Sequence, residues 1–149
     1  MSGLGFDDAV SRHIDALYRT DDAARRRRAV LDAATPAPGE RVLDVGCGPG
    51  FLAAELADAV GPAGRVVGID TSEPMLALAR RRCGDRPWTE VQSGDASRLA
   101  LADGDVDLAV SVQVHEYVPD VDRGLAEMAR VLRPGGRAVI VATDWPSIV

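Results

Sequence analysis

Residues 42–50, with the sequence VLDVGCGPG, constrain the fold of this chain more than any other stretch. They begin as a short apolar run of the kind that forms a buried parallel strand, and they continue as alternating glycines. From Phe51 an alanine- and leucine-rich pattern predicts a helix. A strand, a glycine turn and a helix N-terminus in this order form a site for a nucleotide-like ligand, because backbone N–H groups point out of the turn and glycine lets the ligand approach closely.

Strands and helices alternate from Arg41 to residue 142. The pattern predicts strands at 42–45, 65–69, 89–92, 106–112 and 137–142, and helices at 51–60, 75–83 and about 121–132, the last ended by Arg133-Pro134-Gly135-Gly136. Strands that are separated by helical crossovers imply an α/β fold with a mostly parallel sheet and helices on both faces.

Two further helices are predicted before the glycine turn. The first carries an apolar face with helical spacing, made of Val10, Ile14, Leu17 and Tyr18, and the second runs from about residue 22 to 34 with Thr20 or Asp21 as its cap. We expect one domain over residues 1–149, in which residues 1–38 form a helical cover and residues 39–149 form the ligand-binding core.

Composition disfavours several classes of function. The net charge of −6 argues against general nucleic-acid binding, and the run 25–28 of four arginines lies among acidic residues, as on a solvated helix face. No apolar run is long enough to span a bilayer and the N-terminus has no signal pattern, so we expect a cytoplasmic protein without a membrane partner. Cys47 and Cys83 are too few for a disulfide framework or a zinc site, so we expect reduced thiols and no metal.

The residues around the glycine turn narrow the choice of ligand. A dinucleotide fingerprint requires glycine or alanine where Phe51 stands, and the absence of lysine excludes a P-loop. Asp44 precedes the turn within a buried strand, where it would repel a pyrophosphate but suits a cation or an amine. Asp70 follows the second strand, where a carboxylate accepts from ribose hydroxyls, and Asp95 follows the third, where it can accept from an adenine amino group. The three acids together suit S-adenosylmethionine (SAM), which has a cationic amino-acid end, a ribose and an adenine.

With these features the chain resembles the class I, Rossmann-like SAM-dependent methyltransferases. The matching segments occur in family order at residues 42–50, 68–70, 94–96, 107–114 and 131–137. The resemblance implies a sheet of strand order 3-2-1-4-5, SAM as the methyl donor and no metal. The small-molecule branch, which includes quinone-biosynthesis and arsenite methyltransferases, is the most similar, so a small-molecule acceptor and no nucleic acid are expected.

The resemblance also implies which residues contact the cofactor. They are Asp44, Gly46, Cys47, Gly48 and Gly50 at the methionine part, Asp70, Thr71 and Met75 near the ribose and adenine, Gly94, Asp95 and Ala96 at the adenine, and Val112 and Gln113 near the sulfonium. Alternative roles exist for several of them: Met75 as helix core, Asp95 as an Asx turn residue and Asp70 as an acid that leads a helix. Asp44 has the weakest alternative, because an unpaired carboxylate in a buried strand is costly.

The sequence says less about the catalytic residues and about the oligomeric state. Methyl transfer relies on positioning, and His115, just past the fourth strand, is a candidate general base whose alternative is simply to lead the next helix. Related enzymes continue past the fifth strand, whereas this chain stops seven residues later. A homo-oligomer that covers the fifth strand is therefore expected, and an inactive SAM-binding domain or a truncated half of a heteromeric enzyme is the alternative function.

Overall fold

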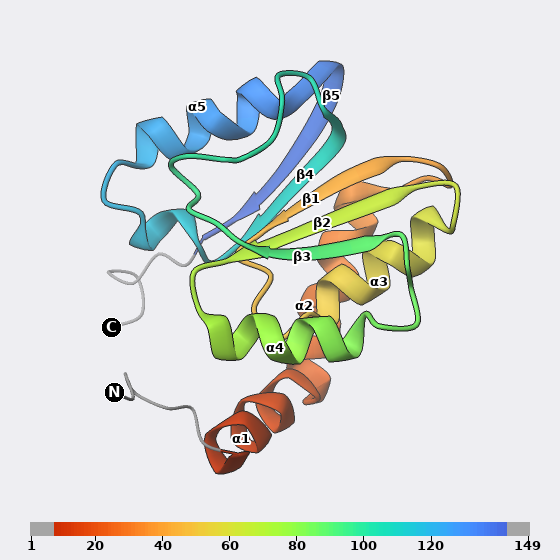
Figure 1. The fold of residues 1–149 in the computed structure, drawn as a ribbon, viewed down its shortest axis with the longest axis vertical. Coiled ribbons are helices and arrows are strands. Elements are labelled where there is room, and N and C mark those ends of the chain that lie inside the picture. The colour runs from red at the N-terminus through yellow and green to blue at the C-terminus, as the bar shows by residue number, and fades with distance from the viewer. Residues whose placement is uncertain (1–7, 143–149) are drawn as a thin grey trace.

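The computed structural model describes residues 8–142, which form a five-stranded sheet flanked by helices (Figure 1). The strands are β1 (Arg41–Val45), β2 (Arg65–Asp70), β3 (Thr89–Ser93), β4 (Val106–Val112) and β5 (Leu132–Val141). The helices are α1 (Asp8–Tyr18), α2 (Asp21–Ala34), α3 (Phe51–Val60), α4 (Glu73–Arg82), the 3₁₀ helix η1 (His115–Tyr117) and α5 (Val121–Val131). All neighbouring strands are parallel and their order is β3-β2-β1-β4-β5, which confirms the predicted topology.

The central strand β1 separates two apolar layers, because its side chains alternate between the faces of the sheet. Val42 packs with residues of α2 and α3 on one face, whereas Leu43 packs with Met128 of α5 on the other. Figure 1 shows this division, with α5 on one side of the sheet and α2, α3 and α4 on the opposite side. Asp44 follows Leu43, so it faces the same side as Val42, toward α2 and α3.

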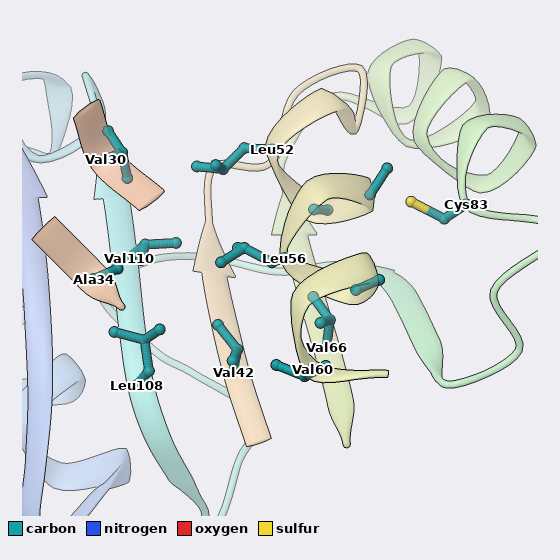
Figure 2. Close-up of a cluster of buried hydrophobic side chains, with 13 residues drawn as sticks. Val30, Ala34, Val42, Leu52, Leu56, Val60, Val66, Cys83, Leu108 and Val110 are labelled. Carbon is teal, nitrogen blue, oxygen red and sulfur yellow. The ribbon is translucent and has the colours of Figure 1, made fainter. Parts of the chain in front are cut away.

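The layer under α2 and α3 forms the larger core and anchors the N-terminal region to the sheet. Val30 and Ala34 of α2 belong to one buried cluster with Leu52 and Leu56 of α3 and with strand residues such as Val110 (Figure 2). Because Val30 and Ala34 are buried in this cluster, α2 is an integral part of the core and not a loose appendage.

The helix ends follow the capping signals in the sequence. Thr20 caps α2, since its Oγ1 accepts a hydrogen bond from the Ala23 N–H (3.3 Å), and Ser72 caps α4 by accepting from the Met75 N–H (3.4 Å). Gly61 ends α3 with a positive φ of 66°. The predicted strands and helices agree with the observed bounds to within about two residues at most ends.

The start of β5 corrects the sequence prediction. Residues 133–136 were expected to end the preceding helix, but β5 begins at Leu132, directly after α5. Val106 pairs with Leu132 and Leu108 pairs with Arg137, so residues 133–136 bulge out opposite Asp107 alone. The bulge is held by an ion pair between Arg133 and Asp107. Proline and glycine therefore mark an irregularity within the strand pairing here.

The helix α1 contacts the rest of the protein through an aromatic residue and an ion pair. Tyr18 stacks on Phe51 at the start of α3, with ring centroids 5.7 Å apart, and the Arg82 guanidinium lies 3.6 Å from the Phe51 centroid. Arg82 also pairs with Asp15 of α1. The rest of the predicted apolar face is more open than expected, since Val10 and Leu17 are exposed.

Ile140 and Val141 are exposed on β5, which lies at the edge of the sheet. The homo-oligomer that was expected to cover this edge stays a prediction. The expectation about the end of the chain falls on residues 143–149, which lie outside the described residues. Among residues 8–142 no helix is long and apolar enough to cross a membrane.

Candidate functional site

A cavity of about 780 Å³ opens at the carboxyl ends of β1, β2 and β4. Its walls come from the glycine turn, the turns after β2 and β3, the segment after β4 and the end of α1. The lining residues are Tyr18, Val45, Gly46, Gly48, Ile69, Asp70, Thr71, Met75, Gly94, Asp95, Ala96, Val112, Gln113, Val114, Tyr117, Val118 and Pro119. The structure thus brings together ten of the thirteen residues expected to contact the cofactor.

Asp70 links the two turns that form the floor of this cavity. Its Oδ2 accepts a hydrogen bond from the Gly48 N–H (2.9 Å), and its Oδ1 accepts one from the Ser72 N–H (2.9 Å). Asp70 therefore precedes α4 and binds its first turn, which is the alternative role considered above, and it also fixes the glycine turn. A carboxylate has lone pairs for further donors, so these bonds leave it able to accept from ribose hydroxyls.

Two glycines of the turn serve different purposes. Gly46 lines the cavity with φ of 70°, and a Cβ there would lie 2.2 Å from Cγ2 of Val114. Gly50 is not one of the residues that line this cavity; with φ of 89°, a Cβ on it would lie 2.7 Å from the Ala79 Cα. The geometry therefore gives Gly50 a packing role between α3 and α4, and its expected contact with a ligand stays a prediction.

The adenine end combines a buried floor with an exposed acid. Met75 and Ala96 are buried and line the cavity, so Met75 serves both the core and the site. Asp95 Oδ1 accepts from the N–H and the hydroxyl of Ser97, both at 2.8 Å. These bonds lower the pKa of Asp95, with the backbone bond as the largest cause. Asp95 is thus an Asx turn residue that also lines the cavity.

A second cavity of about 370 Å³ lies between the N-terminal helices and the sheet. It shares Tyr18, Gly46, Val112 and Gln113 with the first cavity, so the two adjoin. Its remaining lining residues are Leu17, Ala23, Arg26, Arg27, Val30, Asp44, Cys47 and Leu52. Asp44 and Cys47, which were expected at the methionine part of the cofactor, therefore face this second cavity.

Asp44 is the most unusual titratable group of the site. Its side chain is 2% exposed, and its Oδ2 has no hydrogen-bond partner among the described residues. Burial, with a smaller contribution from the Asp70 charge, raises the pKa of Asp44 to about 8. A buried acid without a partner is costly to the fold, and such groups gather at functional sites.

Tyr18 is a site residue that the sequence analysis missed. It lines both cavities, and its hydroxyl would lie 3.4 Å from a Cβ on Gly48. Burial, followed by the Asp70 and Asp44 charges, raises its pKa. The sequence shows only a tyrosine on an apolar helix face; its place in the site follows from the stacking on Phe51, which sequence spacing does not reveal. Tyr117, Val118 and Pro119 were missed in the same way.

His115 lines neither of the two cavities, although its neighbour Val114 lines the first. Its ring is 4% exposed, and Nδ1 is 2.8 Å from the Ser111 hydroxyl. The opposite ring edge faces α5, where a Cβ on Gly124 would lie 3.1 Å from Cδ2. This position suits a core histidine that fixes the segment after β4, and it gives no support to a proton transfer in the cavity. No cluster of three metal-ligating side chains occurs within residues 8–142.

Comparisons with known proteins agree with this geometry. Residues 43–140 match the family described as "Methyltransferase domain". An uncharacterized 37.1 kDa protein in a transposon of Streptomyces fradiae is 46% identical over 99% of this chain and 44% of its own length. A demethylmenaquinone methyltransferase of Beutenbergia cavernae is 41% identical over 94% of this chain and 52% of its own length.

Solved structures show the same likeness. A SAM-dependent methyltransferase from Aquifex aeolicus superposes with a TM-score of 0.66 and 29% identity, over 72% of this chain and 58% of that one. The chain spans about half the length of the curated relatives it matches.

Proposed function

This chain belongs to the class I SAM-dependent methyltransferases, and we propose that it transfers the methyl group of SAM to a small-molecule acceptor. The observation that carries the proposal is the cavity at the carboxyl ends of β1, β2 and β4, which gathers the glycine turn, Asp70 and the Gly94–Ala96 turn around one space. Ligands of open parallel sheets bind at this edge.

The residues present fit the cofactor. A Cβ at Gly46 would meet Val114, so the turn leaves room that only glycine provides. The Asp44 oxygen without a partner suits an ammonium group, and Asp70 at the end of β2 suits ribose hydroxyls. Apolar Met75 and Ala96 are suited to flank a flat adenine ring.

SAM supplies a methyl group that is activated on a positively charged sulfur. What the protein contributes is the alignment of donor and acceptor and the exclusion of water, since holding two reactants in line lowers the barrier without a catalytic side chain. We assign Val112 and Gln113 to the sulfonium region, because both line the two adjoining cavities.

The acceptor side of the cavity is apolar. Val114, Tyr117, Val118 and Pro119 form the wall that the cofactor residues leave, and the whole volume of about 780 Å³ leaves room for a second molecule beside adenosine. This wall suits a flat or apolar acceptor. The name of the similar Beutenbergia protein, a demethylmenaquinone methyltransferase, supports the same class.

Calorimetry with S-adenosylhomocysteine (SAH) and with NAD as the control ligand tests the proposal. We expect SAH to bind and NAD not to bind, and the reverse result would contradict it. A screen of phenols and quinols for SAH formation from SAM then tests transfer. SAH binding without turnover of any acceptor would favour the inactive SAM-binding domain.

A further inference from the structure

The segment after β4 supplies the acceptor wall of the first cavity, which consists of Val114, Tyr117, Val118 and Pro119. The segment begins at a strained residue. Gln113 has a positive φ of 56°, a conformation that residues other than glycine rarely adopt, and its N–H donates to the Val141 carbonyl oxygen (2.6 Å). A strained backbone persists only where its surroundings fix it, so the wall depends on contacts that hold the turn of η1 in place.

His115 holds this turn from the interior of the protein. Its ring is buried, and Nδ1 lies 2.8 Å from the hydroxyl of Ser111, a fully buried residue of β4. The other ring nitrogen, Nε2, is also buried and has no hydrogen-bond partner among residues 8–142. An apolar side chain such as leucine would fill the same space without burying an unpaired nitrogen, so the bond to Ser111 is what distinguishes histidine here.

Gly124 of α5 provides the space for the His115 ring. A Cβ on Gly124 would lie 3.1 Å from Cδ2 and 3.3 Å from Nε2 of the ring, which is closer than ordinary van der Waals contact. Glycine inside a helix destabilises that helix relative to alanine. The helix therefore has glycine where an alanine would press on the ring, and the ring is held between Ser111 on one side and α5 on the other.

We propose that His115 is a positioning residue that sets the affinity for the methyl acceptor, an inference that rests on the function proposed above. The ring keeps the turn of η1 in one conformation, so Tyr117 and Val118 present a preformed wall to the acceptor. A preformed wall binds more tightly, because binding then requires no ordering of the turn. In this role the ring transfers no proton, so the transfer rate at saturating acceptor depends little on it.

Two titrations separate the acceptor side from the donor side. Calorimetry with 1-naphthol on the full chain saturated with SAH measures the first, and titration of SAH alone measures the second. We expect His115→Gln to weaken 1-naphthol binding by about tenfold and to leave SAH binding within about threefold, because Asp70 and residues 94–96 belong to other turns. His115→Asn should keep part of the 1-naphthol affinity, since its shorter amide can take the place of Nδ1 beside Ser111. His13→Gln is the matched control, because it removes the other histidine of the chain, which is exposed on α1, and it should change neither affinity.

Gly124→Ala reaches the same contact from α5. The added Cβ should press on the ring and weaken 1-naphthol binding by about threefold to fivefold, although alanine favours the helix. When Gly124→Ala is combined with His115→Gln, binding should be no weaker than in His115→Gln alone, since the ring that the Cβ meets is gone. Such non-additivity is the mark of a direct contact. Ala126→Ser, on the exposed side of the same helix, is the control and should leave binding unchanged.

Hydrogen exchange measures the turn itself without a ligand. The N–H groups of Tyr117 and Val118 donate to the carbonyl oxygens of Val114 (3.0 Å) and His115 (3.3 Å). We expect both amides to exchange about tenfold faster in His115→Gln and at an unchanged rate in His13→Gln.

Three results would each overturn this role of His115 and leave the proposed function standing. They are unchanged 1-naphthol binding in His115→Gln, an equal loss of SAH affinity in that variant, and a parent protein that binds SAH but not 1-naphthol. A parent protein that binds no SAH would refute the proposed function, and the role of His115 with it.

Discussion

The two ends of the proposed cofactor site use their acids in opposite ways. At the adenosine end, Asp70 accepts hydrogen bonds from backbone N–H groups of the glycine turn and of its own turn, and Asp95 accepts one from its own turn. At the amino-acid end, Asp44 is buried and its Oδ2 has no hydrogen-bond partner among residues 8–142. The carboxylates of the first end find their partners within the fold, whereas the buried acid of the second end lacks a partner that an ammonium group of a ligand would supply.

This difference shows how one edge of the sheet can be stabilised by hydrogen bonds at one place and have an unpaired group for a ligand at another. Bonds from N–H groups favour the charged form of a carboxylate, so they fix Asp95 as an anion and lower its pKa. Burial without a partner does the reverse to Asp44, whose pKa is raised to about 8. Hydrogen bonds therefore stabilise the carboxylates of the adenosine end, whereas burial of Asp44 at the amino-acid end destabilises its charged form.

The largest effect is expected from Asp70→Ala, which breaks the preformed end. The substitution leaves the Gly48 and Ser72 N–H groups without their acceptor and removes the carboxylate for the ribose. We expect SAH affinity to fall by about a hundredfold or more and the midpoint of thermal unfolding to fall as well. Calorimetry and thermal melts measure both.

Asp58→Ala is the control for that experiment. Asp58 is an exposed acid on α3 whose partner is Arg86, so its loss should leave SAH affinity unchanged. Unaltered SAH binding in Asp70→Ala would show that the turns hold without this carboxylate, and the contrast between the two ends would disappear.

Asp44→Asn probes the other end through pH. Because the pKa of Asp44 is about 8 in the ligand-free protein, an ammonium ligand must displace a proton at lower pH. The SAH affinity of the parent protein should therefore rise from about pH 6 to about pH 8, while Asp44→Asn binds about tenfold more weakly and with a flat profile over that range. A parent profile as flat as that of the variant would contradict the assignment of the ammonium to Asp44.

The pH dependence of protein stability tests the raised pKa of Asp44 independently of ligand binding. Its pKa is raised from 3.8 in the unfolded chain to about 8 in the folded protein. A group raised in this way stabilises the fold fully below the lower value and loses that contribution as pH rises through the higher one. Thermal melts should show Asp44→Asn gaining stability relative to the parent protein between about pH 5 and pH 8, and a constant difference would argue against the raised pKa.

The sequence predicted the rigid end of the site better than the cover. Asp70 ends β2 and Asp95 comes two residues after β3, so strand periodicity alone places them at one edge of a parallel sheet. Tyr18 of α1 and Arg26 of α2, which both line the second cavity, belong to helices whose docking depends on the stacking at Phe51 and on burial of Val30. Such tertiary contacts leave no local pattern, which is why these two residues had to be found in the structure.

Two other differences between the sequence prediction and the structure have local causes, although the catalytic role of His115 stays a prediction. Residues 133–136 contain proline and two glycines, which end helices but also form bulges, and only the pairing of β4 with β5 decides between these outcomes. His115 follows the carboxyl end of β4, where ligands bind, yet the turn of η1 directs its ring toward Ser111 and α5. Position in the chain predicted the region correctly but not the direction of the side chain.

His115→Gln tests whether a residue outside both ends affects the chemistry. The variant loses a packed ring and changes the bond to Ser111, so we expect a loss of about 1–2 kcal/mol in the free energy of unfolding. The transfer rate, measured with an acceptor from the screen above, should change by less than about fivefold. A fall of a hundredfold or more in a folded variant would be the signature of a general base and would restore the catalytic role.

The smallest effect is expected from Asp15→Asn, which loosens the cover over the amino-acid end. Asp15 pairs with Arg82, whose guanidinium lies against Phe51 and so fixes the α1 helix that carries Tyr18. The pair is partly exposed, so we expect a loss of only about 0.5–1 kcal/mol in the free energy of unfolding, and this loss should shrink in high salt. Because α1 bounds the second cavity, SAH affinity should fall slightly, by about twofold, while the affinity for 5′-methylthioadenosine, which has the same adenosine part without the amino-acid end, stays constant. If Asp15→Asn weakened both ligands to the same degree, the cover would serve the whole site, and the amino-acid end would lose its special dependence on the N-terminal helices.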